Sequence, residues 1–280
     1  MKRPKSVALV GGGNFSSSSL ARFWSLSEKL GPVKASSFRL ASRIANALRA
    51  GYPVKDFAEF NTCTVVLISV PDRSLLEVIA QLGSAGISWR GKSVILCSEC
   101  RGSCDLRELA VRGAATASLT AIPGFHNSRF LLEGDRRAVQ HAKHLIETRE
   151  VHSVTIEGGL KPLYLAALTC TTSLLFPLIM VATEALRRAN VPAAASKSIL
   201  EKQILNCLRS YARGGKRAYE PPQELFTQLH ALSARDPRFA HYVEQSSRLA
   251  EQVLHRDAIG RKNVAHALAH AASPLIGTRS

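Results

Sequence analysis

The first 160 residues alternate short runs of β-branched and aliphatic residues with stretches of helical period, and this alternation constrains the fold more than any other feature. The predicted strands are residues 6–10, 33–37, 64–70, 93–97, 117–121, 130–133 and 151–156. The predicted helices between them are 19–30, 40–50, 74–84, 105–111 and 136–148. Strands separated by helices of this length form βαβ units, so the sequence predicts a mainly parallel sheet covered by helices.

The strand signals stop after Gly158 and Gly159. The following helical stretches are residues 162–190, 193–212, 222–234 and 237–271, separated at Pro192, Gly214-Gly215 and Asp236-Pro237. A chain of 280 residues is long enough for two domains. We therefore expect an α/β domain over residues 1–158 and an all-α domain over residues 159–280.

An uncharged segment runs from Pro162 to Thr183, and its length alone admits a membrane span. Three threonines, Ser173 and the mid-segment Pro177 favour another explanation. We expect a helix over 162–190 that is largely buried between domains or subunits, and no membrane.

The charge balance favours anionic partners. Lys and Arg number 37 against 21 Asp and Glu, which gives a net charge of +16. A phosphorylated cofactor, an acidic substrate or a polyanion would each suit such a field. The basic residues near the end of the second C-terminal helix, Arg209, Arg213, Lys216 and Arg217, have no accompanying aromatic platform. We therefore interpret them as a solvated helix end and expect no nucleic acid.

Cysteine usage and the N-terminus favour a cytoplasmic protein. Six cysteines in 280 residues do not form the dense framework of a small secreted domain. The apolar run from Val7 to Val10 is too short for a secretion signal. Cys97, Cys100 and Cys104 have no nearby fourth Cys or His, so we predict reduced thiols and no metal site.

A glycine-rich turn lies between the first predicted strand and the first predicted helix. Gly11 and Gly13 match the first two glycines of the dinucleotide-binding pattern G-x-G-x-x-G, and Ser16 replaces the third. With Asn14 and Phe15 they predict a tight turn that seats a pyrophosphate at a helix N-terminus. A purely structural turn is the alternative.

The end of the second predicted strand distinguishes NAD from NADP. An acidic residue there would hold the ribose 2′-hydroxyl, but the chain has Ser36, Ser37, Phe38 and Arg39. Because Ser37 and Arg39 suit a 2′-phosphate, the sequence predicts NADP rather than NAD. The alternative is that Arg39 is a solvated residue of the second helix.

Four further residues follow predicted strands and are candidates for the site. Val70 and Pro71 end the third strand, where cofactor contacts collect, although they also suit a turn before a helix. Ser98 follows the fourth strand and places a hydroxyl near the expected nicotinamide. His126, in the loop after the fifth strand, is able to donate a proton at neutral pH or is an ordinary surface histidine.

An ordered set of motifs points to a family. It comprises Gly11-x-Gly13, Val66–Asp72, Ser98, Leu132–Asp135 and Lys161–Ala167. Together they resemble the two-domain Rossmann-like proteins that carry the DUF2520 C-terminal domain. These are similar to pyrroline-5-carboxylate reductase, ketopantoate reductase and the 6-phosphogluconate dehydrogenase superfamily.

This resemblance implies a Rossmann-type nucleotide-binding domain, a helical C-terminal domain used for dimerisation, and an active cleft between them. It also implies that Lys161, at the start of the interdomain helix, orients the substrate and supplies a proton. Tyr164 follows one turn later on the same helical face.

The chain departs from the family pattern at several polar positions. Leu165 stands where a histidine is usual, and Ser173 where an asparagine is expected. The segments 118–121 and 220–223 also differ from the family's serine-histidine-proline and threonine-glycine-proline motifs. These departures bear on the chemistry more than on the fold.

Two functional hypotheses follow. The first is an NADP-dependent reductase or dehydrogenase that transfers a hydride to a C=O or C=N bond of a small anionic substrate, with a proton from Lys161, Tyr164 or His126. The second is a non-catalytic, dimeric descendant that keeps the scaffold as a binding or regulatory module.

Overall fold

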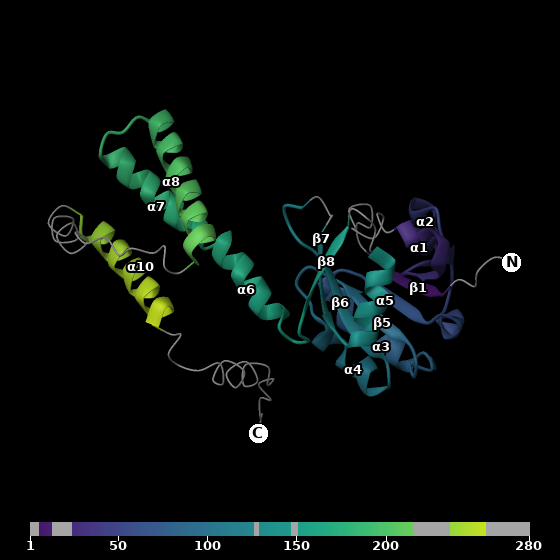
Figure 1. Cartoon of the computed structure of the whole chain (residues 1–280). Coiled ribbons are helices and arrows are strands. Elements are labelled where there is room, and N and C mark those ends of the chain that lie inside the picture. The colour runs from purple at the N-terminus through teal and green to yellow at the C-terminus, as the bar shows by residue number, and fades with distance from the viewer. Residues whose placement is uncertain (1–5, 13–23, 126–128, 147–150, 216–235, 256–280) are drawn as a thin grey trace, which may run out of the picture. The chain divides into compact units, whose positions relative to one another are not determined.

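The computed structural model describes residues 6–12, 24–125, 129–146, 151–215 and 236–255 (Figure 1). The internal contacts divide the chain into two units, residues 1–170 and 171–280. This division lies beyond the predicted boundary near residue 158, because the helix that follows the last strand groups with the first unit.

The first unit contains an eight-stranded sheet in the order β3-β2-β1-β4-β5-β6-β7-β8. Its strands are β1 (Val7–Gly11), β2 (Leu30–Lys34), β3 (Tyr52–Pro53), β4 (Val65–Ser69), β5 (Ser93–Cys97), β6 (Ala115–Ala121), β7 (Arg129–Gly134) and β8 (His152–Ile156). Every neighbouring pair is parallel except β6 and β7, which are antiparallel. The predicted α/β fold with a mainly parallel sheet is confirmed.

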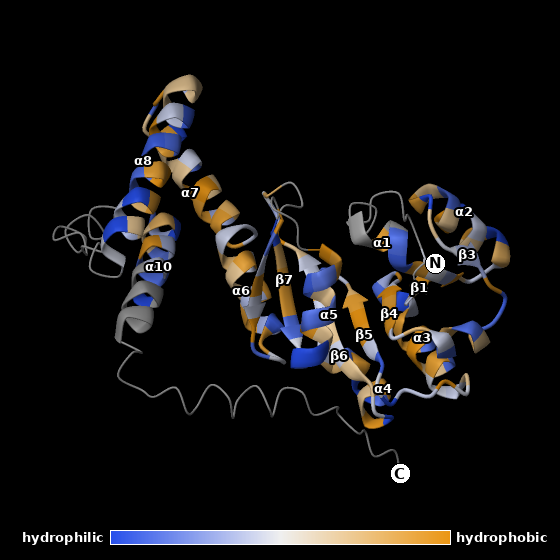
Figure 2. Cartoon of the chain, turned by 45° about the vertical axis from the view of Figure 1, so that its right-hand side comes forward, coloured by the Kyte–Doolittle hydropathy of each residue, from blue (hydrophilic) through white to orange (hydrophobic). Residues whose placement is uncertain are grey.

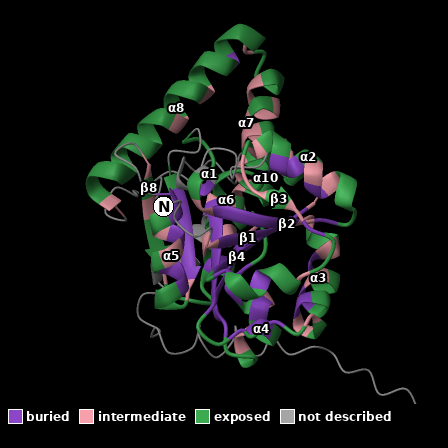
Figure 3. Cartoon of the chain, turned by 90° about the vertical axis from the view of Figure 1, so that its right-hand side faces the viewer, coloured by how far each residue is buried: buried purple, intermediate pink, exposed green. Residues whose placement is uncertain are grey.

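Helices cover both faces of this sheet and create two cores. The side chains of β1 alternate between them, since Val7 and Leu9 belong to one core, and Ala8 and Val10 to the other. The first core also receives residues from α1 (Trp24–Lys29), α2 (Phe38–Leu48) and α5 (Arg136–Ile146). The second receives residues from α3 (Asp72–Ser84) and α4 (Arg107–Val111). The central strands β1, β4 and β5 therefore form a layer buried on both sides, whereas the edge strands β3 and β8 are largely exposed (Figure 3).

Two local differences from the sequence prediction have simple causes. The second strand spans Leu30–Lys34 instead of 33–37, because Ser37 caps α2: its Oγ accepts a hydrogen bond from the Leu40 N–H at 3.1 Å. The edge strand β3 has only two residues, too few to show a period in sequence. Short 3-10 helices, η3 (Ala58–Thr62) and η4 (Ser103–Leu106), complete the connections.

Helices make up the rest of the described chain. The predicted helix 162–190 is two helices, α6 (Lys161–Thr171) and α7 (Leu175–Arg188), with a turn between them. They are followed by α8 (Ala193–Gly214), which contacts α7, and α10 (Pro237–His255). The predicted helix 222–234 and residues 256–271 lie outside the described residues. The all-α character expected for this region is confirmed for its described part.

The expectation that 162–190 is largely buried is wrong for the single chain. None of residues 162–190 is buried, and Phe176 and Met180 are 63% and 60% exposed. The buried Lys161 immediately precedes this range. The apolar character of α6 and α7 is plain in Figure 2. By length and composition, Lys161–Arg188 would suit a membrane span, with a mean hydropathy of 2.0 over its most apolar window. An exposed apolar surface of this kind marks an interaction site.

Candidate functional site

The site is set by the topology of the sheet. The chain leaves β1 toward β2 and β3, then crosses to β4 on the other side of β1, so the connection reverses direction beside β1. In open α/β sheets, the crevice outside the carboxyl ends of the strands at such a reversal binds ligands. A cavity of about 390 Å³ lies there, lined by Val10, Gly11, Gly12, Lys34, Ala35, Ser36, Phe57, Val70, Pro71, Arg73, Ser74, Glu77, Val78 and Gln81.

The turn after β1 approaches the end of β4 closely. The Gly12 N–H donates to the Ser69 carbonyl at 2.9 Å. A Cβ added at Gly12 would lie 3.3 Å from Cδ of Pro71, which is tighter than ordinary packing. The predicted residues Gly11, Val70 and Pro71 are therefore brought together on one cavity. The predicted Gly13, Asn14, Phe15 and Ser16 lie outside the described residues.

The cavity has an apolar and a polar part. Phe57, Val70 and Val78 supply apolar surface, suitable for a flat aromatic base. Lys34 and Arg73 supply positive charge. The Lys34 Nζ donates to the Ala35 carbonyl at 2.8 Å and lies 5.5 Å from the centre of the Phe57 ring. The mixture suits a ligand with an aromatic ring and an anionic group.

The two residues predicted to hold a 2′-phosphate lie differently from the expectation. Arg39 is exposed in the first turn of α2 and does not line the cavity. Ser37 is also absent from the lining, and its hydroxyl oxygen caps the helix. Sequence reasoning missed Lys34 and Arg73, although their basic side chains at two strand ends were a visible signal.

Ser98, at the carboxyl end of β5, organises its own loop. Its hydroxyl donates to Oδ1 of Asp72 at 3.1 Å and accepts from the N–H groups of Cys100 and Arg101 at 3.2 and 3.0 Å. Ser98 thus joins the start of α3 to the loop after β5. The predicted His126 lies outside the described residues.

Lys161 is 1% exposed and has hydrogen-bond partners within the protein. Its Nζ donates to the Ser98 carbonyl at 2.8 Å and to the Arg101 carbonyl at 2.5 Å. Burial lowers the pKa of Lys161, while the nearby Glu133 carboxylate opposes that shift. This geometry holds the loop after β5 against the start of α6, which favours a positioning role for Lys161.

Glu133 is a residue that sequence reasoning did not select, and it is fully buried. Its carboxylate accepts from the N–H and hydroxyl of Ser103, from the hydroxyl of Ser118 and from the N–H of Gly159, at 2.5 to 3.1 Å. Burial alone would raise the pKa of Glu133, but these hydrogen bonds outweigh it and lower the pKa. The signal in sequence was a lone carboxylate within an apolar strand.

Tyr164 presents a buried hydroxyl on α6. No hydrogen-bond partner for this hydroxyl lies within the part of the chain that the structure describes. Burial raises the pKa of Tyr164, so the phenol keeps its proton at neutral pH. A buried, protonated hydroxyl with no partner among the described residues makes Tyr164 a candidate proton donor.

The cysteines show no metal-binding group within the described part of the chain. No group of three Cys, His, Asp or Glu side chains suited to a metal ion occurs among the residues with a described position. Burial raises the pKa of the Cys97 thiol to about 12, although Lys161 opposes that shift. Cys97 is therefore a neutral thiol at physiological pH.

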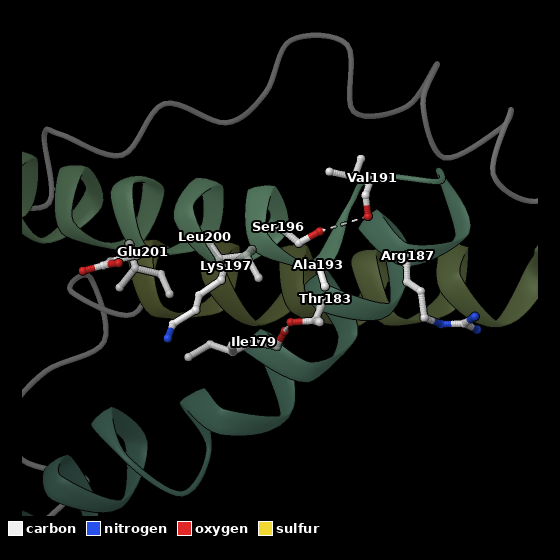
Figure 4. A pocket seen from close by; sticks show the side chains of 10 residues that line it. Ile179, Thr183, Arg187, Val191, Ala193, Ser196, Lys197, Leu200 and Glu201 are labelled. Carbon is white, nitrogen blue, oxygen red and sulfur yellow. Dashed lines mark hydrogen bonds between the residues drawn. The ribbon is translucent and has the colours of Figure 1, made fainter.

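A second cavity, of about 500 Å³, lies between α7 and α8 (Figure 4). It is lined by Ile179, Thr183, Arg187, Val191, Ala193, Ser196, Lys197, Leu200, Glu201 and Ile204. The Ser196 hydroxyl donates to the Val191 carbonyl at 3.4 Å. Most of this surface is aliphatic, and it is a groove in the helical unit rather than a catalytic cluster.

Comparisons with known proteins support the fold. No protein-family model matches the chain, and no curated protein matches it, so the DUF2520 resemblance stays a prediction. Solved structures do match. A candidate NADP oxidoreductase from Bacteroides fragilis is 15% identical, with a TM-score of 0.68 over 90% of this chain and 99% of the other.

Two imine reductases match over similar lengths. A variant from Myxococcus stipitatus in complex with NAD+ is 12% identical, with a TM-score of 0.64 over 91% of this chain and 94% of the other. An enzyme from Aspergillus terreus in complex with NADPH4 and a dibenzazepine is 16% identical, with a TM-score of 0.63 over 92% and 95%. The chain therefore has the fold of Rossmann-type oxidoreductases, an α/β domain followed by helices.

Proposed function

We propose that the protein is an NADP-dependent reductase or dehydrogenase that transfers a hydride to a C=O or C=N bond of a small anionic substrate. The main support is the cavity beside β1, at the point where the chain connection changes direction across the sheet. A glycine turn, apolar side chains and two cations line this cavity. The matching structures include a candidate NADP oxidoreductase and imine reductases in complex with NAD+ or NADPH4, which supports this choice.

The residues present fit a nicotinamide dinucleotide. The backbone at Gly11 and Gly12 would approach the pyrophosphate, since no side chain stands in the way there. Phe57, Val70 and Val78 would face the adenine. When bound, the cofactor supplies the hydride, and the protein has to position it and manage a proton.

We propose Tyr164 as the residue that supplies the proton. Its hydroxyl is buried, protonated at neutral pH and lacks a partner among the described residues. Lys161 instead orients the loop after β5 through the carbonyls of Ser98 and Arg101. Tyr164→Phe should then reduce turnover while leaving cofactor affinity unchanged.

The substrate class rests on charge and on the fold neighbours. The net charge of +16 attracts anions at a distance. Because imine reductases are among the matching structures, we favour a substrate with a C=N bond over one with a C=O bond. A panel of anionic cyclic imines, their neutral counterparts and matching keto acids would separate the two preferences.

Cofactor titration is the decisive test of the proposal. Calorimetry of the full chain with NADPH and NADH should show saturable binding, tighter for NADPH. Turnover is then followed as oxidation of NADPH with each substrate of the panel. Absence of binding for both cofactors at millimolar concentration would overturn the reductase proposal.

The two hydrogen bonds that the Lys161 ammonium donates to backbone carbonyls favour one alternative. In this alternative the protein is a dimeric scaffold that binds nucleotide without catalysis. A lysine whose ammonium holds two carbonyls is poorly placed to protonate a substrate. This alternative predicts tight NADPH binding with no turnover on any imine or ketone, and Tyr164→Phe would then change nothing.

We also propose that the protein is a cytoplasmic homodimer, joined through the helices of the C-terminal region. The support is the exposed apolar surface of α6 and α7, which includes Leu163, Phe176 and Met180, and the aliphatic groove between α7 and α8. A second copy of the chain would cover this surface without a membrane.

A further inference from the structure

We infer that Lys34 and Arg73 hold the 2′-phosphate of NADP and so determine the choice of cofactor. The inference rests on the proposed function, since it concerns the adenosine end of the same cofactor. It assigns the phosphate to two cations that line the cavity, in place of Arg39, which does not line it.

Lys34 and Arg73 come from different elements and reach one cavity. Lys34 is the last residue of β2, where the ribose 2′-position of a bound dinucleotide lies. Arg73 is the second residue of α3, which starts directly after β4. Two cations from separate elements on one cavity lining suit a dianion, and Ser36 adds a hydroxyl to the same lining.

The Lys34 side chain is held in place but retains donors. Its Nζ uses one hydrogen bond on the Ala35 carbonyl and faces the ring of Phe57. An ammonium has three donors, so further contacts are open to a ligand. The aromatic ring beside the ammonium also provides a surface on which adenine would stack.

Several other described cations have partners within the protein. Arg187 and Arg188 pair with Glu184, and Lys92 donates to the carbonyls of Asn61 and Cys63. Neither Lys34 nor Arg73 pairs with a carboxylate of the described residues.

The carboxylate that lines the cavity, Glu77, accepts a hydrogen bond from Gln81 at 3.1 Å. The cavity therefore keeps a net positive charge, and the β2 end has Ala35 and Ser36 where an NAD site would carry an acidic residue.

The test compares ligands that differ by one phosphate. Full-length wild-type protein and the variants Lys34→Ala, Arg73→Ala and Arg39→Ala are titrated by calorimetry with NADPH, NADH, adenosine 2′,5′-bisphosphate and AMP. Lys34→Ala and Arg73→Ala should each weaken NADPH and the bisphosphate by roughly ten- to a hundredfold, with NADH and AMP nearly unchanged. Arg39→Ala, the matched control, should change none of them.

Further variants and conditions separate a specific contact from general charge. Lys34→Arg keeps the cation and should retain most of the preference for NADPH. Circular dichroism and thermal unfolding of each variant establish that it is folded. The preference of the wild type for the bisphosphate over AMP should persist at high salt, because a direct contact is screened less than a diffuse field.

The possible failures are distinguishable. Equal weakening of both cofactors by Lys34→Ala and Arg73→Ala, or a selective effect of Arg39→Ala, would overturn this inference and leave the proposed function standing. Binding of neither NADPH nor NADH to the wild type would overturn the proposed function and this inference with it.

Discussion

The sheet unit and the helical unit differ in how far their side chains are buried. In the sheet unit, both faces of the strands are covered, and buried polar groups such as Glu133 and Lys161 are hydrogen-bonded. In the described helices of the second unit, α7 buries no residue and α8 buries only Ser196. The central strands of the sheet unit are covered within one chain, whereas α7 and α8 expose the kind of apolar surface that marks an interaction site.

This contrast separates two origins of stability. The sheet unit owes its order to its own contacts, including a buried carboxylate with four donors. The helical unit has α7 and α8 in mutual contact, with large apolar side chains facing outward. Mutations in the first should therefore change unfolding, and mutations in the second should change association.

The largest effect is expected at Glu133. Glu133→Gln replaces acceptor oxygens by an amide that cannot satisfy all of the donors from Ser103, Ser118 and Gly159. The free energy of unfolding should fall by about 3 kcal/mol, measured by urea denaturation. Glu157→Gln, at an exposed position directly after β8, should change it by less than about 0.5 kcal/mol. Equal effects of the two variants would contradict the role of Glu133.

The next effect concerns association. Phe176 and Met180 lie one turn apart on α7 and are both exposed, so replacing both with lysine places two charges in the proposed interface. The dimer dissociation constant should rise at least about thirtyfold, which corresponds to about 2 kcal/mol.

Sedimentation without detergent is the measurement, and Val111→Lys, 81% exposed on α4, is the control that should leave association unchanged. A wild type that is monomeric at every concentration would contradict the dimer. A wild type that requires detergent would instead support a membrane role for Lys161–Arg188.

A smaller effect is expected at the glycine turn. Gly12→Ala would bring a methyl group to 3.3 Å from Cδ of Pro71 and 3.5 Å from Cγ1 of Val70. The strain should cost about 1 kcal/mol and weaken NADPH and NADH together, because the turn serves both cofactors. Gly158→Ala, whose added Cβ meets only an ordinary contact at 3.5 Å, should leave both affinities unchanged. A loss confined to NADPH would contradict this reading of the turn.

The smallest effect is expected in how the free energy of unfolding changes as the pH is lowered. The pKa of Glu133 in the folded protein lies below its ordinary value of 4.5, because its hydrogen bonds outweigh the opposing effect of burial. Its contribution is therefore fully present above pH 4.5 and declines as the pH falls through the folded pKa. Unfolding free energies measured on acidification should fall less steeply in Glu133→Gln than in the wild type. Identical slopes would show that other groups control the acid response.

The order of elements was readable from the sequence because it depends on local pattern. The runs 65–68 and 94–97 are continuously apolar, as is typical of strands buried on both faces, and the structure has β4 and β5 there. The glycine turn after β1 and the turn at Val70 and Pro71 were likewise predictable as neighbours, because the carboxyl ends of parallel strands meet at one edge.

Residues that are brought together by contacts between segments distant in sequence could not be predicted from the sequence. Lys34 and Arg73 are 39 positions apart by their numbers, and only the pairing of β2 and β4 with β1 brings them to one cavity. Arg39 had the better local context, yet the cap formed by Ser37 starts α2 early and leaves Arg39 exposed. The start of a helix depends on a side chain-to-backbone hydrogen bond that hydrophobic period does not show.

The sequence by itself therefore determined the class of the fold, the order of its strands along the chain and the position of the nucleotide turn. The tertiary structure decided that Glu133 and Lys161 are buried anchors of the loop after β5, and that α6 and α7 face outward in a single chain. The physical reason is that the spacing of apolar residues shows which face of a helix or strand must be buried. Which segment covers that face, or which group hydrogen-bonds to a buried charge, is determined only when segments distant in sequence come into contact.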